Sequence, residues 1–197
     1  MPVARLFSVV AIVSALAVLS LGSATVRAAD TYQVDPVHSM LLFRIKHFNV
    51  SNLYGRINNP TGTLVVDEAD PSKSSVEIEV KPENVDTAIE KRDQHLKGPD
   101  FFNAKQFPTI TFKSKSVKKA DDANIEVAGD LTLLGVTKEI TVKFARVGAG
   151  KDPMGGYRTG YEGTFSIKRS DYGMKNMLEN VGDDVQLTVS VEGSRKL

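Results

Sequence analysis

The sequence has 197 residues, of which 41% are hydrophobic and 25% are charged. This composition is typical of a single globular domain and excludes a disordered, collagen-like or low-complexity chain. With 25 basic and 24 acidic residues the formal charge is +1, so no basic field would attract nucleic acid. The absence of cysteine excludes disulfides, thiolate catalysis and cysteine-ligated zinc or iron–sulfur sites.

Residues 1–28 predict a cleaved secretory signal peptide. The 21 positions between Arg5 and Arg27 carry no charge, and Val26-Arg27-Ala28 supplies the small residues that precede a cleavage site. The alternative is an uncleaved membrane helix, which we disfavour because Ser, Ala and Gly dilute the segment. Cleavage after Ala28 would leave residues 29–197 with 23 basic and 24 acidic side chains, a net charge of −1.

After Asp30 the dominant pattern is strict alternation of apolar and polar residues, which is typical of strands with one apolar face. Turn residues separate the alternating runs, and short links indicate antiparallel neighbours. The pattern predicts about eight or nine strands, with a long turn at 148–156. They lie at 39–46, 54–59, 61–66, 76–80, 110–113, 125–133, 139–144, 161–168 and 184–192.

One segment breaks the alternation and predicts a short helix near residues 87–97. Thr87-Ala88-Ile89-Glu90 resembles a capping box, Lys91 to Lys97 continues as a polar helix, and Gly98-Pro99 ends it. The fold class is therefore all-β, with one inserted α-helix.

Amphipathic strands of this number can close into a barrel or pack as a sandwich, and closure removes exposed edges. With no Trp, 5 Tyr and 9 Phe, the chain lacks the aromatic girdles of an outer-membrane barrel, so we expect the apolar face inside. Such a barrel can be filled by side chains or can enclose a ligand.

Catalytic chemistry finds little support in the sequence. The three histidines are His38, His47 and His95, and the nine-residue separation of the first two sends their side chains to opposite faces of a strand. Neither a nucleophile elbow nor a phosphate loop is present. We therefore predict no catalytic residues, no metal site and no cofactor.

Two apolar segments lie outside the predicted strands. Phe101, Phe102 and Phe107 follow the helix stop, either as a flap over a barrel opening or as anchors of the helix on the core. Met174, Met177 and Leu178 precede the last strand, either as an adaptable rim that contacts lipid or as a loop packed on its own barrel.

Several motifs together resemble the YceI-like family, over essentially all of residues 30–193. They are Val34-Asp35-x-x-His38-Ser39, Arg92-Asp93-x-His95-Leu96, Asp100-Phe101-Phe102-Asn103-Ala104, Phe107-Pro108-x-Ile110-x-Phe112, Gly129-Asp130-Leu131-Thr132-Leu133-Leu134-Gly135-Val136-Thr137-Lys138, Arg169-Ser170-Asp171-Tyr172-Gly173-Met174 and Val181-Gly182-Asp183-Asp184-Val185.

The resemblance implies a lipocalin-like antiparallel barrel in the bacterial periplasm that is not an enzyme. Its tunnel would hold a long isoprenoid chain, such as a polyprenyl phosphate or the tail of a quinone. The candidate tunnel residues are apolar: Leu41, Phe43, Ile45, Val76, Ile78, Ile110, Phe112, Leu131, Leu133, Phe165 and Ile167. The candidates at the tunnel mouth are His38, His47, Arg92, His95, Phe101, Phe102, Met174 and Met177.

Two alternatives stay open. The protein could be an enzyme that acts on a lipid, with His38, His47, Arg92 or His95 near the opening, or a filled barrel that acts through its surface. The expected partner is an isoprenoid lipid rather than nucleic acid, with transient contact with a membrane or with membrane redox proteins, and with a homodimer as a further expectation.

Overall fold

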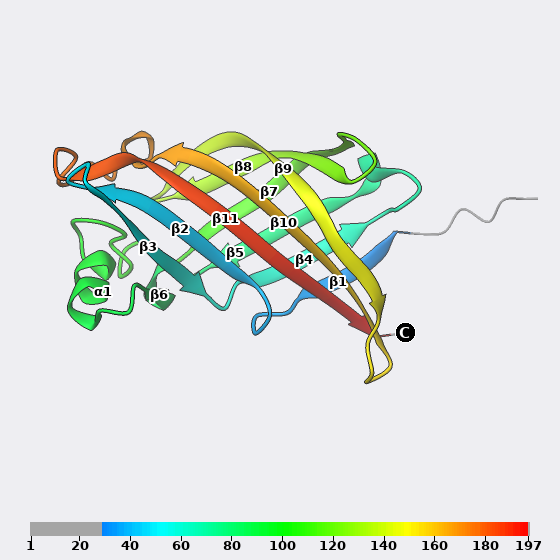
Figure 1. Cartoon of the computed structure of the whole chain (residues 1–197). Coiled ribbons are helices and arrows are strands. Elements are labelled where there is room, and N and C mark those ends of the chain that lie inside the picture. Colours follow the sequence, from blue (N-terminus) through cyan, green and yellow to red (C-terminus); the bar gives the residue numbers. More distant parts are fainter. Residues whose placement is uncertain (1–28, 197) are drawn as a thin grey trace, which may run out of the picture.

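The computed structural model describes residues 29–196 (Figure 1). The predicted signal peptide, residues 1–28, lies outside the described residues. Within 29–196, no helix is long and apolar enough to cross a membrane.

Residues 29–196 form eleven strands, one α-helix and three short 3-10 helices. The α-helix α1 spans Glu90–Lys97, and the 3-10 helices are η1 (Pro71–Lys73), η2 (Pro82–Asn84) and η3 (Arg169–Tyr172). The strands are β1 (Asp30–Val34), β2 (Met40–His47), β3 (Ser51–Asn58), β4 (Thr61–Val66), β5 (Ser75–Val80), β6 (Val85–Asp86), β7 (Ile110–Lys119), β8 (Asn124–Leu133), β9 (Val136–Lys151), β10 (Gly156–Lys168) and β11 (Val181–Lys196).

Eight of these strands close a barrel in the order β1-β4-β5-β7-β8-β9-β10-β11, and every pairing is antiparallel. The ring closes where β11 pairs with β1, Val34 opposite Gly193. The predicted all-β barrel of about eight strands with one inserted helix is therefore confirmed.

One edge of the strand β11 pairs with β10, and its other edge has two successive partners. It pairs with β2 from Val181 to Ser190 and with β1 only at Gly193 and Ser194. The wall thus divides: β1 completes one end, whereas β2, β3 and β6 continue it at the other end, where α1 lies (Figure 1). This division makes the two ends of the barrel different.

Two of the three apolar clusters fill one part of the interior. One is built on Tyr32, Val34, Leu64 and Val191, and the other on Val117, Val127, Val142 and Phe144. The third cluster contains Phe101, Leu131, Tyr172 and Met174 and lies toward α1 and the loop before β11. The alternating residues of the strands supply these clusters, as the period-2 pattern predicts.

Three local predictions need correction. Thr87–Glu90 is not a capping box. The helix begins at Glu90, and its N-cap residue is Ile89, whose side chain makes no capping hydrogen bond. Thr87 instead donates its backbone N–H to the side chain of Asp93. The segment 148–156 is largely strand, because β9 continues to Lys151 and β10 begins at Gly156. The sequence pattern also missed β1 and the two-residue β6, since both are too short to show a clear period.

Candidate ligand-binding site

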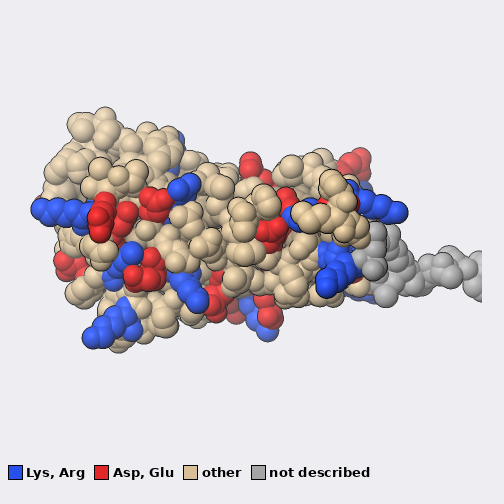
Figure 2. All heavy atoms as spheres, turned by 90° about the horizontal axis from the view of Figure 1, so that it is seen from below, with Lys and Arg blue, Asp and Glu red and all other residues tan. Residues whose placement is uncertain are grey.

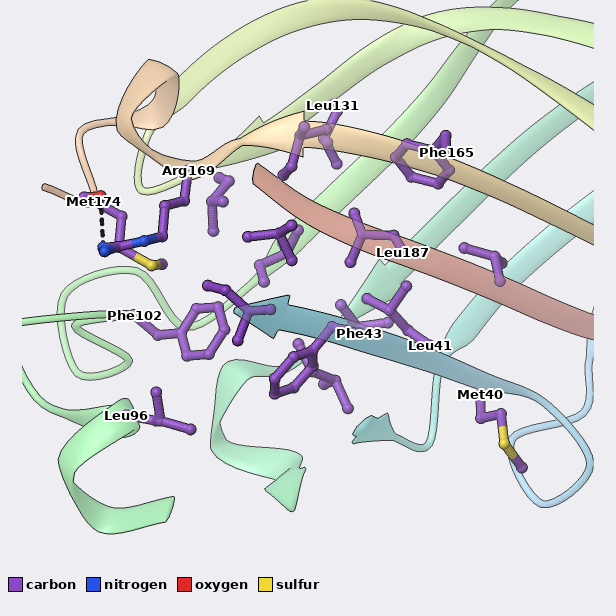
Figure 3. A pocket seen from close by; sticks show the side chains of 18 of the residues that line it. Met40, Leu41, Phe43, Leu96, Phe102, Leu131, Phe165, Arg169, Met174 and Leu187 are labelled. Carbon is purple, nitrogen blue, oxygen red and sulfur yellow. Dashed lines mark hydrogen bonds between the residues drawn. The ribbon is translucent and has the colours of Figure 1, made fainter. Parts of the chain in front are cut away.

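The barrel encloses a cavity of about 730 Å³. This volume lies within the range of roughly 300–1,000 Å³ that is typical of ligand pockets. The barrel is therefore partly hollow, with its filled part at the end closed by β1. Hydrocarbon side chains from almost every strand face this space, and Figure 3 shows Leu41, Phe43, Leu131, Phe165 and Leu187 pointing into it.

The structure places all eleven predicted tunnel residues in the lining of the cavity. These residues occupy the positions of their strands that face the interior, and such positions recur at every second residue. They are Leu41, Phe43, Ile45, Val76, Ile78, Ile110, Phe112, Leu131, Leu133, Phe165 and Ile167.

An opening, here called the mouth, lies between the outer edge of β3 and α1. β6 pairs with β3 only at Arg56 and Ile57, so within residues 29–196 the edge from Ser51 to Gly55 has no strand beside it. Lining residues come from that edge, from α1, from the loop with Phe101 and Phe102, and from the loop with Met174 and Met177. The apolar lining thus reaches the surface at the end where α1 lies.

Seven of the eight predicted mouth residues line the cavity, and His38 does not. The seven are His47, Arg92, His95, Phe101, Phe102, Met174 and Met177. His38 lies before β2 and His47 is the last residue of this strand, so the length of β2, roughly 23 Å from Met40 to His47, separates the two histidines. The imidazole of His38 instead lies 2.9 Å from the carboxylate of Asp35.

Arg92 fastens α1 to the segment before it. Its Nε donates to Thr87 Oγ1 at 2.7 Å and its Nη2 donates to the Thr87 carbonyl oxygen at 2.6 Å. Asp93 accepts hydrogen bonds from the backbone N–H and the hydroxyl of the same threonine. Arg92 therefore contributes its aliphatic stem to the lining, while its guanidinium already has partners within the protein.

His95 is held by its neighbours in a similar way. Its Nε2 lies 3.0 Å from Asp100, and its ring meets the ring of Phe101 edge-on, with centroids 5.0 Å apart. Phe101 is buried and Phe102 is half-buried, so these rings both anchor the loop after α1 and line the mouth. The two roles that the sequence left open coexist in Phe101 and Phe102, whereas Phe107 does not line the cavity.

Sequence reasoning missed Arg169, a fully buried arginine in the lining. Its guanidinium donates to three carbonyl oxygens: Nε to Gly182 at 2.9 Å, Nη2 to Val181 at 2.8 Å and Nη1 to Met174 at 3.0 Å. Figure 3 shows the bond to Met174. Burial lowers its pKa, and the nearby carboxylate of Asp183 opposes that shift. The alternation of the sequence could have identified Arg169, because it lies two residues after Ile167 and four after Phe165, where the alternation places an inward-facing side chain.

Outside the cavity, Asp35, His38 and Glu192 bring three potential ligand atoms within 4.8 Å of one another. A guanidinium already occupies this group: Arg158 Nη1 donates to Asp35 at 2.8 Å and also contacts Glu192. These hydrogen bonds raise the pKa of Arg158, so its charge is permanent. We assign no metal to this cluster, because a fixed cation holds the carboxylates together.

The fold and the cavity define a class: closed antiparallel β-barrels with an internal apolar cavity that opens at one end. A family model for the YceI-like domain matches residues 32–193. The chain is 43% identical over 187 residues to a UPF0312 protein of Pseudomonas aeruginosa, covering 92% of this chain and 97% of that protein. It is 42% identical over 176 residues to protein YceI of Escherichia coli O157:H7, covering 88% and 90%. The chain belongs to the YceI-like family.

Solved structures agree with this assignment. A Campylobacter jejuni YceI protein superposes with a TM-score of 0.69 at 30% identity, covering 77% of this chain and 90% of that one. Burkholderia cenocepacia BcnA gives 0.74 at 22% identity, covering 81% and 98%. A polyisoprenoid binding domain from Saccharophagus degradans gives 0.64 at 16% identity, covering 82% and 97%; at that identity the likeness shows the fold alone.

Proposed function

We propose that this protein is an exported, periplasmic binding protein that holds a long isoprenoid chain in its barrel. The observation that carries the proposal is the cavity of about 730 Å³ with its hydrocarbon lining. The ligand class is a polyprenyl phosphate or an isoprenoid quinone. Residues 1–28 support export, because they have the charge pattern and the cleavage site of a signal peptide.

The lining decides which kind of molecule suits the cavity. A buried water needs two to four polar partners, and side chains such as Leu131, Phe165 and Leu187 offer none. A hydrocarbon chain needs none, and its burial contributes roughly 25 cal/mol for each Å² of apolar surface. The chain of the ligand, rather than its head group, would supply most of the affinity. The polyisoprenoid binding domain of S. degradans, which shares this fold, supports the same ligand class.

Binding accounts for the polar side chains at the mouth better than catalysis does. Arg92 is bonded to Thr87, His95 to Asp100, and Arg169 to three carbonyl oxygens. These contacts position loops and α1, and none of them pairs a base with a nucleophile. We therefore propose that the mouth residues shape the entrance rather than transform the ligand.

Mass spectrometry of the bound lipid tests this proposal. The full chain would be exported in its own host, purified without delipidation and analysed under native conditions, then fragmented. We expect a lipid with an isoprenoid chain in the intact complex. A barrel that is repeatedly free of lipid, or that holds lipids with no isoprenoid chain, would contradict the proposal.

Two adjacent leucines of β2 provide matched variants. Leu41 faces the cavity, whereas Leu42 is 39% exposed on the outer surface. A Leu41→Trp variant would fill part of the cavity and should reduce the bound lipid severalfold. Leu42→Trp should retain the wild-type amount, and equal retention by both variants would place the lipid outside the barrel.

A further inference from the structure

Large apolar side chains surround the mouth on the outside of the molecule. Val50 is 83% exposed, Tyr54 is 65% exposed and Phe48 is 53% exposed. Ile89 precedes α1, and Met177 and Leu178 lie in the loop before β11. We call these six residues the mouth rim: Phe48, Val50, Tyr54, Ile89, Met177 and Leu178.

The two most prominent parts of the rim are joined to each other. The turn between β2 and β3 carries Phe48, whose backbone N–H donates a 2.7 Å hydrogen bond to the carbonyl oxygen of Asn180. Asn180 in turn donates its N–H to the carbonyl oxygen of Met177. In Figure 1 both loops lie at the end of the barrel that also carries α1. The turn that carries Phe48 and the loop that carries Met177 are therefore held side by side.

Folding alone does not explain these residues. Phe48 has a φ of 49° and Met177 a φ of 55°, in the left-handed region that disfavours bulky side chains. A turn with this backbone is normally built from Asn and Gly. The ring of Phe48 meets the ring of His47 edge-on, with centroids 4.3 Å apart, and Phe48 stays 53% exposed. Strained positions that expose apolar side chains point to a function outside the barrel.

The charges near the rim favour an anionic surface. Three exposed lysines and two exposed glutamates adjoin the rim in sequence, and within residues 29–196 none of them makes a salt bridge: Lys46, Lys91, Lys175, Glu90 and Glu179. Three lysines and two glutamates leave an excess of one positive charge. Figure 2 shows, at the same end of the molecule, a stretch of surface without Lys, Arg, Asp or Glu.

We propose that the mouth rim docks on a lipid bilayer that contains anionic phospholipids, with Phe48, Val50 and Met177 inserted at the interface. The inference rests on the proposed function and adds the membrane as the source or destination of the bound chain. Met177 belongs to the rim and also lines the cavity, and so does His47, which precedes the rim residue Phe48. A hydrocarbon chain could therefore pass between bilayer and cavity without crossing water. Apolar tips flanked by lysines have the pattern of interfacial insertion.

The absence of tryptophan from the chain provides a direct test. A Phe48→Trp variant has one tryptophan, at the rim. Its emission should shift to shorter wavelength on vesicles of phosphatidylethanolamine and phosphatidylglycerol, and lipids brominated in the acyl chain should quench it. Met154→Trp is the matched control, because Met154 is 89% exposed in the turn between β9 and β10, away from the mouth. An unshifted Phe48→Trp spectrum, or equal shifts in both variants, would overturn the proposal.

Loss-of-function variants give a second readout. Phe48→Ser combined with Val50→Ser should weaken vesicle binding in flotation assays by about tenfold or more, because two inserted side chains are lost. Val147→Ser combined with Met154→Ser, which removes two exposed apolar residues elsewhere, should not change it. If the Phe48→Ser/Val50→Ser variant binds vesicles as tightly as wild type, the membrane assignment is wrong. It is also wrong if light scattering shows that the wild-type rim pairs with a second copy of the chain and the protein does not bind vesicles.

The lipid content of the same variants separates the two proposals. Both pairs leave the cavity lining intact, so both proteins should still carry lipid when purified from the envelope. Wild-type protein that carries an isoprenoid but ignores vesicles would overturn the docking surface and leave the proposed function standing. Wild-type protein that binds vesicles through Phe48 but carries no lipid would overturn the proposed function and leave the docking surface standing.

Discussion

The guanidinium of Arg169 donates a 3.0 Å hydrogen bond to the carbonyl oxygen of Met174, five residues further along the chain. Two more donors reach Val181 and Gly182, so one buried side chain holds both ends of the loop that borders the mouth. The loop is further fixed by Ser170, which donates its N–H and its hydroxyl to Asp183. The shape of the entrance therefore depends on an arginine that, within residues 29–196, makes no hydrogen bond to a carboxylate and donates to backbone carbonyl oxygens instead.

Replacement of this arginine should destabilise the protein. Arg169→Met leaves three buried carbonyl oxygens without their donors, and we expect a loss on the order of 3 kcal/mol in the free energy of unfolding. Urea denaturation measures this loss. The neighbouring Lys168→Met removes only an exposed ion pair with Asp184 and should cost less than about 1 kcal/mol. Similar losses for both variants would show that Arg169 does not organise the loop.

The cluster at Asp35 predicts how stability depends on pH. Hydrogen bonds from His38, Arg158 and two backbone N–H groups hold the pKa of Asp35 well below its ordinary value. Its contribution to stability is therefore complete above the unfolded pKa of about 3.9 and is lost as the pH falls through the lower folded value.

Asp35→Asn tests this dependence by denaturation at several pH values. We expect a loss on the order of 2 kcal/mol at pH 7 that shrinks steadily below about pH 4. Asp122→Asn is the control, because this side chain is fully exposed, and its effect should stay small throughout. A loss in Asp35→Asn that does not change with pH would show that the carboxylate charge is not what matters.

The closure of the barrel at β1 depends on a glycine. A Cβ atom added to Gly193 would lie 2.8 Å from Tyr32 Cβ and 3.0 Å from Leu64 Cδ1, both in a packed cluster. Gly193→Ala should therefore destabilise the protein by about 1–3 kcal/mol in thermal or urea unfolding. Gly148→Ala, which meets no atom within 4 Å, should be neutral or slightly stabilising. Equal effects would contradict tight packing at this closure.

The rim predicts a conflict between stability and docking. Phe48→Gly relieves a left-handed backbone but loses the ring contact with His47, so we expect the free energy of unfolding to rise by about 0.5–1 kcal/mol. The same variant should bind vesicles less tightly. Val50→Gly also removes a rim side chain, yet it should lower stability, because its backbone is not left-handed. We therefore expect the two variants to change the free energy of unfolding in opposite directions and to weaken vesicle binding in flotation alike. A loss of stability in both variants would show that the backbone of Phe48 is not strained.

The sequence by itself determined the class of fold and many of the residues that line the cavity. Alternation gives each strand one apolar face, because successive side chains point to opposite sides, and the lack of aromatic girdles places that face inside. Leu41, Phe43, Phe165 and Ile167 could therefore be assigned to the interior before any strand was paired. The end of α1 was also predictable, since the Gly98 N–H makes the final hydrogen bond to the carbonyl oxygen of His95.

Only the tertiary structure decided where the interior is hollow. The same period-2 pattern places Val127 in a filled cluster and Leu131 in the lining of the cavity, because packing depends on what faces a residue across the barrel. Strand pairing likewise made one edge of β11 divide between β1 and β2. Arg169 acquired its role in the same way, since its three acceptors come from a loop whose path no local pattern specifies.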